Sequence, residues 1–160
     1  MEYVKLFQVL NQNKVKYLIC GGLAVNIYGI PRMTADVDLL LDFDEPNLER
    51  FENSVKMLLF NQLLPVSIKT FISKEERQKA VTEKNLIAYS YYNSQLGYMN
   101  LDVLLDTPVE FETLWKNRSS RKITDTDIYL VGIEDLIQLK TYANRVQDQQ
   151  DVILLSKLLK

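Results

Sequence analysis

Histidine is absent from the 160-residue chain, and cysteine occurs once, at Cys20. Without histidine the chain cannot build a Ser-His-Asp or Cys-His catalytic group, a histidine general acid or base, or a histidine-bound zinc site. A single cysteine excludes an internal disulfide and a thiolate zinc site, and is typical of a protein in the reducing cytoplasm. Any chemistry must therefore depend on carboxylates, Lys, Arg, Tyr, Ser, Thr or a bound metal ion.

Long apolar runs and a strong charge of one sign are also lacking. No stretch reaches the ~18 apolar residues of a membrane span, and the N-terminal MEYVKLFQVL predicts an amphipathic helix rather than a signal peptide. The net charge of -2 argues against binding nucleic acid by overall charge, but it does not exclude a local patch of basic residues that binds nucleic acid. With 47% apolar residues, the chain fits one cytoplasmic globular domain with no membrane segment.

Hydrophobic periodicity and turn-forming residues predict alternating helices and strands. Helices are expected over residues 2–13, 23–28, 46–59, 73–84 and 108–116, and two more close the chain over about 133–160. Strands are expected over 17–20, 36–42, 86–92 and 98–105, the last two joined by a hairpin loop NSQLG, with a short strand pair at 121–131. The pattern predicts a single mixed α/β domain over residues 1–160, with its core at about 15–106.

Two carboxylates stand at the start of the expected strand in T-A-D-V-D-L-L-L-D. Side chains alternate along a strand, so Asp36 and Asp38 share a face, roughly 7 Å apart. Asp102 interrupts the apolar run of a later strand, and adjacent strands would bring all three together. Clustered carboxylates repel one another, and Mg²⁺ is the hard, oxygen-seeking ion that would neutralise them. The pattern predicts a divalent-metal site.

Gly21 and Gly22 lie between the strand at 17–20 and the helix after it. Glycines let the backbone approach a ligand, and the helix N-terminus favours an anion, so this turn is suited to phosphate. Arg32 and Thr34 precede the carboxylate strand and could contact phosphate or steady the site. Phosphate beside a divalent metal implies a nucleoside triphosphate, ATP among the candidates, and metal-assisted in-line displacement at phosphorus.

The segment from Gly21 to Leu41, GGLAVNIYGIPRMTADVDLLL, resembles the signature of the minimal DNA polymerase β-type nucleotidyltransferases. That signature is Gly-Gly or Gly-Ser, a helix, then Asp-x-Asp, with a third Asp on a later strand. Within the superfamily the chain resembles the AbiEii/AbiGii-type toxin branch, in which G-G-x-A…G…R-x-T-x-D-x-D recurs. The late segment DLIQLKTYANRVQDQQD (135–151) is similar to that branch in its Lys, Arg and following Asp, while residues 60–95 do not align.

The resemblance implies a fold and a reaction. The fold is a polymerase-β-like nucleotidyltransferase fold, a mixed β-sheet flanked by helices with a C-terminal helical pair. The activity is transfer of a nucleoside monophosphate from a nucleoside triphosphate to a hydroxyl acceptor, with two Mg²⁺ ions or with Mn²⁺ in their place.

The resemblance also implies residue roles. The metal-binding and catalytic carboxylates would be those of Asp36, Asp38 and Asp102, with Asp102 as a candidate general base. The nucleotide-binding residues would be Gly21, Gly22, Arg32, Thr34, Lys140, Arg145 and Asp148. Gly22 departs from the many superfamily members with serine there, so one phosphate contact is missing.

Other functions leave these residues unexplained. Leu40 and Leu41 fall where an EF-hand needs an acid and a glycine, and no Gly-x-Gly-x-x-Gly or P-loop lysine is present. A metal-dependent glycosyltransferase would use Asp-x-Asp but not the Gly-Gly turn or Asp102. The remaining alternative is a non-catalytic nucleotide-binding or interaction module on the same fold.

The acceptor is not encoded in a recognisable motif. The toxin-like resemblance implies tRNA or a protein as acceptor and an antitoxin as partner, while a small molecule such as an aminoglycoside is equally compatible. The basic stretch KNRSSRK (116–122) could contact an RNA backbone, although a solvated loop is the simpler interpretation.

Overall fold

The computed structural model describes residues 2–95 and 99–160. Its elements follow in the order α1 (Glu2–Gln12), β1 (Tyr17–Cys20), α2 (Gly21–Ile27), β2 (Asp36–Leu41), α3 (Glu45–Met57), β3 (Asn61–Gln62), the 3-10 helix η1 (Ile68–Phe71), α4 (Lys74–Lys84), β4 (Ala88–Asn93), β5 (Met99–Leu104), α5 (Phe111–Lys116), β6 (Ser119–Ile123), β7 (Thr126–Leu130), α6 (Ile133–Ala143) and α7 (Val146–Lys157).

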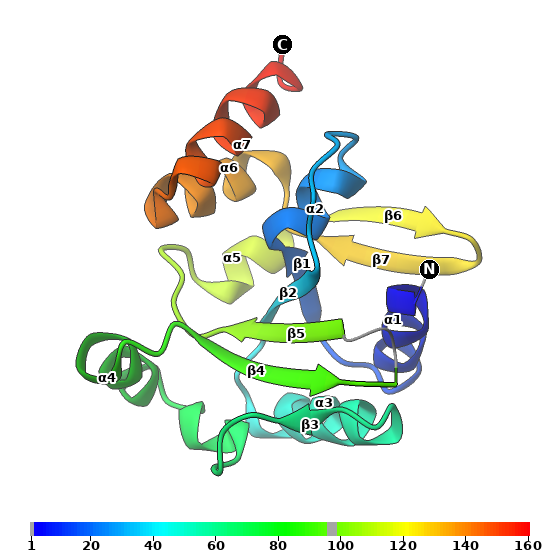
Figure 1. Cartoon of the computed structure of the whole chain (residues 1–160), viewed down its shortest axis with the longest axis vertical. Helices are drawn as coiled ribbons and strands as arrows, with labels where there is room; N and C mark the ends of the chain where they lie inside the picture. The colour runs from blue at the N-terminus through cyan, green and yellow to red at the C-terminus, as the bar shows by residue number, and fades with distance from the viewer. Residues whose placement is uncertain (1, 96–98) are drawn as a thin grey trace.

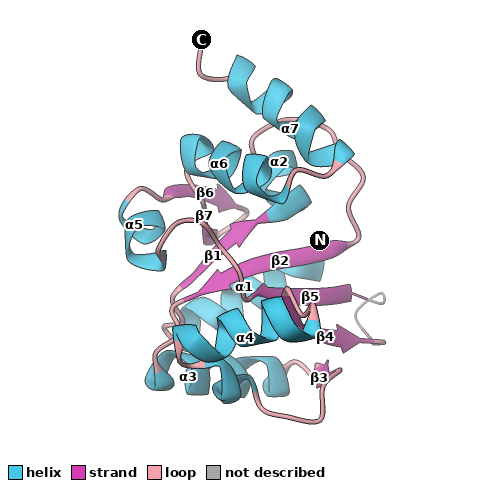
Figure 2. Cartoon of the chain, turned by 90° about the vertical axis from the view of Figure 1, so that its left-hand side faces the viewer, coloured by secondary structure: helices cyan, strands magenta, loops and turns pink. Residues whose placement is uncertain are grey.

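One mixed sheet organises the described chain, in the order β3-β4-β5-β2-β1-β7-β6. The pairs β2·β5 and β1·β7 are parallel, and the other neighbours are antiparallel. In Figures 1 and 2, helices α2, α6 and α7 lie in the upper part of the molecule, nearer the C-terminus of the chain, whereas α3 and α4 lie in the lower part. This mixed α/β architecture agrees with the predicted fold class.

The central strands form where the sequence is most continuously apolar. All of β1, Tyr-Leu-Ile-Cys, is buried, and β2 buries every residue except Asp36 and Asp38. These two strands pair antiparallel, with Cys20 opposite Asp38. Because β1 ends where α2 begins, the sheet places the Gly-Gly turn beside the carboxylates. Cys20 is 1% exposed and therefore packs as a small apolar core group.

Local hydrogen bonds explain where several helices begin. The Asp44 carboxylate accepts from the Asn47 backbone N–H at 2.6 Å and caps α3, and the Ser73 hydroxyl accepts from the Glu76 N–H at 3.1 Å and caps α4. Side-chain acceptors at this position satisfy N–H groups that have no partner within the helix. Ser73 therefore fixes the start of α4, in agreement with the helix predicted over 73–84, and Asp44 fixes the start of α3.

Several predicted boundaries are corrected. The helix after β1 begins at Gly21 rather than residue 23, because Gly21 adopts a φ of +65° that turns the chain directly into it. The helix predicted from Pro108 starts at Phe111. Strand β3 and η1 were not predicted, since neither has a periodic apolar pattern. The predicted loop residues 96 and 97, and strand residue 98, lie outside the described part of the chain.

A membrane-spanning helix is not found: in residues 2–95 and 99–160, none of the helices combines the length and the apolar character that crossing a bilayer requires.

Candidate active site

The predicted carboxylate cluster forms on one face of the sheet where β2 and β5 run parallel. Asp38 pairs in register with Asp102, and Asp36 pairs with Asn100. In-register neighbours on adjacent strands point to the same face, so all three carboxylates lie on one surface. The structure therefore brings together residues that are 66 positions apart in sequence, as the alternation along each strand predicts.

Neutral donors and burial set the charge of the cluster. The Ser90 hydroxyl donates to Asp102 Oδ1 at 2.6 Å, and the Asn100 amide donates to Asp36 Oδ1 at 3.2 Å. Burial, and then the nearby Asp102 and Asp36 carboxylates, raise the pKa of Asp38 to about 6. Burial likewise raises the pKa of Asp102, partly offset by the Ser90 hydrogen bond. Negative charge is thus concentrated here and unfavourable.

The donor set suits a divalent cation. It consists of hard carboxylate oxygens, and the burial and mutual repulsion that raise the pKa values of Asp38 and Asp102 are costs that a bound cation would relieve. Within residues 2–95 and 99–160, however, no group of His, Cys, Asp or Glu side chains is already arranged to hold a metal ion. Rotation of Asp36, Asp38 and Asp102 toward one another would be needed. These residues fit Mg²⁺ by chemistry and by shared face.

Gly21 is a glycine because the carboxylate of Asp38 occupies the space of a side chain. A Cβ added at Gly21 would lie 1.9 Å from Asp38 Oδ2, and the backbone φ of +65° is itself unfavourable for other residues. The turn therefore lies in close contact with the carboxylate face of the sheet. This arrangement places helix α2 and its N-terminal amides directly against the cluster.

Replacing Gly21 by alanine should disrupt the site as well as the backbone. We expect Gly21→Ala to displace the Asp38 side chain and to abolish metal-dependent nucleotide binding measured by calorimetry. The matched control is Gly29→Ala, since Gly29 has a φ of +96° but nothing within 4 Å of an added Cβ. Both variants should lose about 1–2 kcal/mol of stability from the positive φ. Equal nucleotide binding by the two variants would contradict this role of Gly21.

Gly22 is also tightly covered, by residues of the loop before β2. A Cβ there would lie 2.9 Å from Thr34 Oγ1 and 3.3 Å from Arg32 Cζ. The Thr34 hydroxyl thus occupies the space that a serine at position 22 would need, and supplies a hydroxyl at the same turn. Arg32 Nε is buried and, within the described residues, has no hydrogen-bond partner. Four of the predicted nucleotide-binding residues, Gly21, Gly22, Arg32 and Thr34, therefore lie side by side in the structure.

A chain of ion pairs joins this loop to the two C-terminal helices. Arg32 binds Asp151, Asp151 lies 2.9 Å from the Lys140 ammonium, and Lys140 lies 3.2 Å from Asp148. Arg145 Nε then contacts Asp148 at 2.7 Å. Burial would raise the pKa of Asp148, but hydrogen bonds from Arg145 and Lys140 outweigh it and lower that pKa. The alternating charges, with Arg at both ends, form one network.

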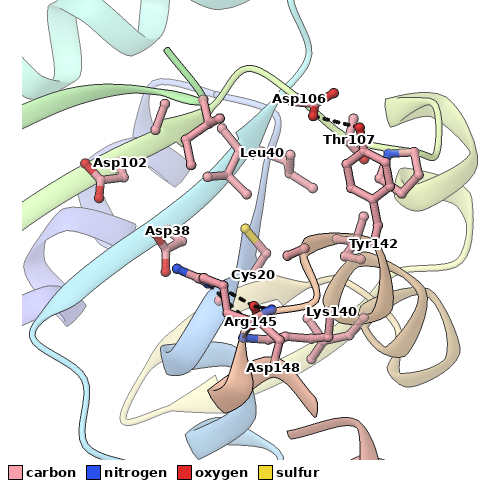
Figure 3. A pocket seen from close by; sticks show the side chains of 18 residues that line it. Cys20, Asp38, Leu40, Asp102, Asp106, Thr107, Lys140, Tyr142, Arg145 and Asp148 are labelled. Carbon is pink, nitrogen blue, oxygen red and sulfur yellow. Dashed lines mark hydrogen bonds and ion pairs between the residues drawn. The ribbon is translucent and has the colours of Figure 1, made fainter. Parts of the chain in front are cut away.

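The network places Lys140 and Arg145 differently. The Lys140 side chain is 5% exposed and is held by two carboxylates, whereas that of Arg145 is 71% exposed. Figure 3 shows Arg145 extending from the start of α7 toward Asp38. Arg145 is thus the more accessible cation, and the predicted contact between Lys140 and triphosphate stays a prediction. The Arg145 backbone N–H donates to Asp148 at 3.2 Å, so Asp148 also fixes the start of α7.

One pocket of about 470 Å³ connects these features. Gly21, Asp38 and Asp102 line it from the sheet and the turn after β1, and Lys140 of α6 and Arg145, just before α7, line it from the C-terminal helices (Figure 3). This volume falls within the range of small-molecule sites. Of the predicted nucleotide-binding residues, Gly22, Arg32 and Thr34 do not line the pocket but adjoin it through Gly21.

Sequence reasoning gave no role to several residues of the site. Ser90 orients Asp102, Asn100 orients Asp36, and Asp151 joins Arg32 to Lys140. Ser90 lies in the segment that did not align, and its position becomes predictable only from the antiparallel register of β4 with β5, which places it opposite Asp102.

Comparisons with solved structures identify the fold. ANT(2″)-Ia in complex with adenylyl-2″-tobramycin matches with a TM-score of 0.61 and 15% identity, over 98% of this chain and 86% of that chain. An antigenic nucleotidyltransferase-like protein from Paracoccidioides brasiliensis gives a TM-score of 0.62 and 20% identity, over 97% and 73%.

The lincosamide antibiotic adenylyltransferase LnuA, bound to lincomycin, gives a TM-score of 0.58 and 15% identity, over 97% and 94% of the two chains. No family model and no curated protein matches the chain. The fold is accordingly the polymerase-β-like nucleotidyltransferase fold.

Proposed function

We propose that this protein is a metal-dependent nucleotidyltransferase that moves a nucleoside monophosphate from a nucleoside triphosphate to a hydroxyl acceptor. One observation carries the proposal: Asp38 and Asp102 lie in register on parallel strands, directly against the tight Gly21 turn. A helix N-terminus beside clustered carboxylates suits a ligand that carries both a metal ion and phosphate. The similar fold of ANT(2″)-Ia and LnuA supports the same reaction class.

The chain supplies binding, orientation and proton transfer. The Gly21–Gly22 amides and Arg32, whose buried Nε has no hydrogen-bond partner within the described residues, would bind the β- and γ-phosphates. Arg145 would take the charge of the leaving pyrophosphate. Asp36, Asp38 and Asp102 would hold Mg²⁺, which when bound polarises the α-phosphate and lowers the pKa of the attacking hydroxyl.

The proposed reaction is an in-line displacement. The acceptor oxygen forms a bond to the α-phosphorus as the bond to the β-phosphate oxygen breaks, and pyrophosphate leaves. The Asp102 carboxylate would accept the acceptor's proton as the general base. The Ser90 hydrogen bond orients that carboxylate.

Two acceptor classes follow from different observations. The Gly-Gly, Arg-x-Thr-x-Asp-x-Asp pattern resembles the AbiEii/AbiGii-type toxins, which favours tRNA or a protein as acceptor and an antitoxin as partner. The fold neighbours named for tobramycin and lincomycin complexes favour a small hydroxylated molecule.

Label transfer tests the function and separates these acceptors. Purified protein is incubated with each α-³²P-labelled nucleoside triphosphate, Mg²⁺ or Mn²⁺, and the RNA, protein or small-molecule fraction of a bacterial lysate. Asp36→Asn is the inactive variant, and Asp127→Asn, an exposed strand carboxylate outside the pocket, is the matched control. We expect label in one fraction with the wild type and Asp127→Asn, and none with Asp36→Asn. Absence of both transfer and metal-dependent nucleotide binding would favour a non-catalytic module.

A further inference from the structure

Two strands form the edges of the described sheet, and they differ in charge. β6, at one edge, carries Arg121 and Lys122, and both side chains are exposed. Charged side chains on an edge strand oppose pairing with another chain. β3, at the other edge, consists of Asn61 and Gln62 and carries no charge; it is the lowest strand in Figure 2. The β3 edge therefore lacks the charge that protects the β6 edge.

The chain around β3 is uncharged and apolar although it lies at the surface. From Met57 to Val66 the sequence is MLLFNQLLPV, without one acidic or basic residue, in a protein with 25% charged residues. Tyr92 lies beside this segment because it pairs with Asn61 across β3 and β4. Five large apolar side chains here are between 41% and 67% exposed and are called the β3 patch: Met57, Leu59, Leu63, Val66 and Tyr92. Such a patch marks an interaction surface.

The backbone of β3 presents hydrogen-bonding groups on its outer side. The Leu63 N–H donates to the Ser90 carbonyl of β4 at 3.0 Å, so Leu63 is at a hydrogen-bonded position of this antiparallel ladder. Such positions alternate along a strand, so the N–H and C=O of Gln62 point away from β4. Gln62 can therefore pair with Gln62 of a second copy about a twofold axis, with two backbone hydrogen bonds exchanged.

The exposed apolar area agrees with a second copy as the occupant. At about 180 Å² for a fully exposed large side chain, the exposed fractions in the β3 patch amount to roughly 500 Å². A standard stable interface covers about 800 Å² on each partner, and about 65% of it is apolar in homodimers, which is about 520 Å². Because the segment has no charge, two copies would not repel each other across the axis, and a strongly charged partner would find no opposite charge to bind.

We propose that the β3 patch joins two copies of this chain about a twofold axis at Gln62, so that their sheets form one continuous sheet. Backbone pairing at Gln62 sets the register, and the apolar side chains supply most of the buried area. Residues 57–66 do not line the pocket of Asp38 and Asp102, so the pocket stays open in both copies. The dimer therefore goes beyond the proposed function and does not depend on it.

Sedimentation equilibrium of the purified chain over a range of concentrations tests the dimer. The wild type should reach twice the mass of one chain. Leu63→Glu would place two carboxylates beside the axis and should weaken association at least about a hundredfold. The matched control is Ile153→Glu on α7, since Ile153 is 60% exposed and Leu63 is 61% exposed; this variant should remain a dimer. Thermal unfolding of each variant checks that it is folded.

Cysteine cross-linking tests the position of the axis independently. The Cα atoms of a hydrogen-bonded antiparallel pair lie about 5.5 Å apart, which a disulfide can span. Gln62→Cys should therefore form a covalent dimer on mild oxidation, and adding Leu63→Glu should suppress it. Gln150→Cys, at an exposed position of α7, is the control and should remain monomeric in denaturing electrophoresis. The natural Cys20 is buried and should not react.

The outcomes are distinct. A wild type with the mass of one chain at every concentration overturns the proposal. A dimer that Leu63→Glu leaves intact also overturns it, and if Ile153→Glu dissociates that dimer, the interface lies on α7. If Leu63→Glu dissociates the dimer but Gln62→Cys forms no cross-link, the continuous sheet is wrong.

Discussion

Asp38→Asn should abolish nucleotidyl transfer while making the metal-free protein more stable at pH 8. Burial and the adjacent carboxylates raise the pKa of Asp38 to about 6, so at pH 8 the folded protein holds a charge that it disfavours. A group whose pKa is raised in the folded state stabilises the fold only at low pH, and that contribution is lost as the pH rises through about 6. Asparagine has no such charge, and we expect a gain of about 2 kcal/mol.

The measurement is urea unfolding in EDTA at pH 8 and pH 4, with transfer assayed in parallel. The gain should be present at pH 8 and nearly absent at pH 4, where Asp38 is protonated in the wild type. Glu83→Gln, which removes an exposed carboxylate on α4, should change neither stability nor transfer. Reduced stability of Asp38→Asn at pH 8 would contradict the picture of a carboxylate held for function against its own electrostatic cost.

Lys140→Met should destabilise the fold by about 2–4 kcal/mol, since it leaves two buried carboxylates with one cation each. The Asp148 side chain is fully buried, that of Asp151 is 5% exposed, and both contact the Lys140 ammonium. Arg145 and Arg32 would still pair with these carboxylates, so we expect the variant to remain folded with reduced stability. In a protein of this length the melting temperature should fall by roughly 5–12 °C.

A double-mutant cycle separates the ion network from simple packing. Adding Asp148→Asn to Lys140→Met removes the fully buried carboxylate and leaves unpaired only the exposed Arg145, so it should recover part of the lost stability, whereas additive losses would indicate that packing dominates. Lys157→Met, at an exposed position of α7, is the matched control and should be nearly neutral. If Lys140→Met keeps its stability but loses triphosphate affinity, then Lys140 acts as a phosphate ligand rather than as the centre of the network.

The carboxylate cluster could be predicted from sequence because strand geometry is simple. Alternation places Asp36 and Asp38 on one face, and an aspartate inside a second apolar run indicates where a neighbouring strand supplies Asp102. The glycine turn could be predicted in the same way, although its contact with Asp38 could not. That contact depends on the register of β1 with β2, which no local pattern encodes.

The C-terminal part of the site could not be derived from local rules. A lysine on an amphipathic helix ordinarily extends to solvent, yet Lys140 is buried because Asp148 and Asp151 converge on it. The link from Arg32 to Asp151 spans 119 residues and depends on how α7 packs. Similarly, the Tyr142 hydroxyl of α6 and the Asp106 carboxylate, 36 residues apart, meet only through the tertiary fold.

The central claim is that the β2–β5 carboxylates hold a metal-bound nucleoside triphosphate against the Gly21–Gly22 turn. A crystal structure with Mn²⁺ and an α,β-methylene triphosphate, with anomalous differences recorded for manganese, tests it most directly. We predict manganese peaks ligated by Asp38 and Asp102, with the β- and γ-phosphates over Gly21 and Gly22. An analogue bound elsewhere, or bound here with no manganese at either carboxylate, would contradict the account.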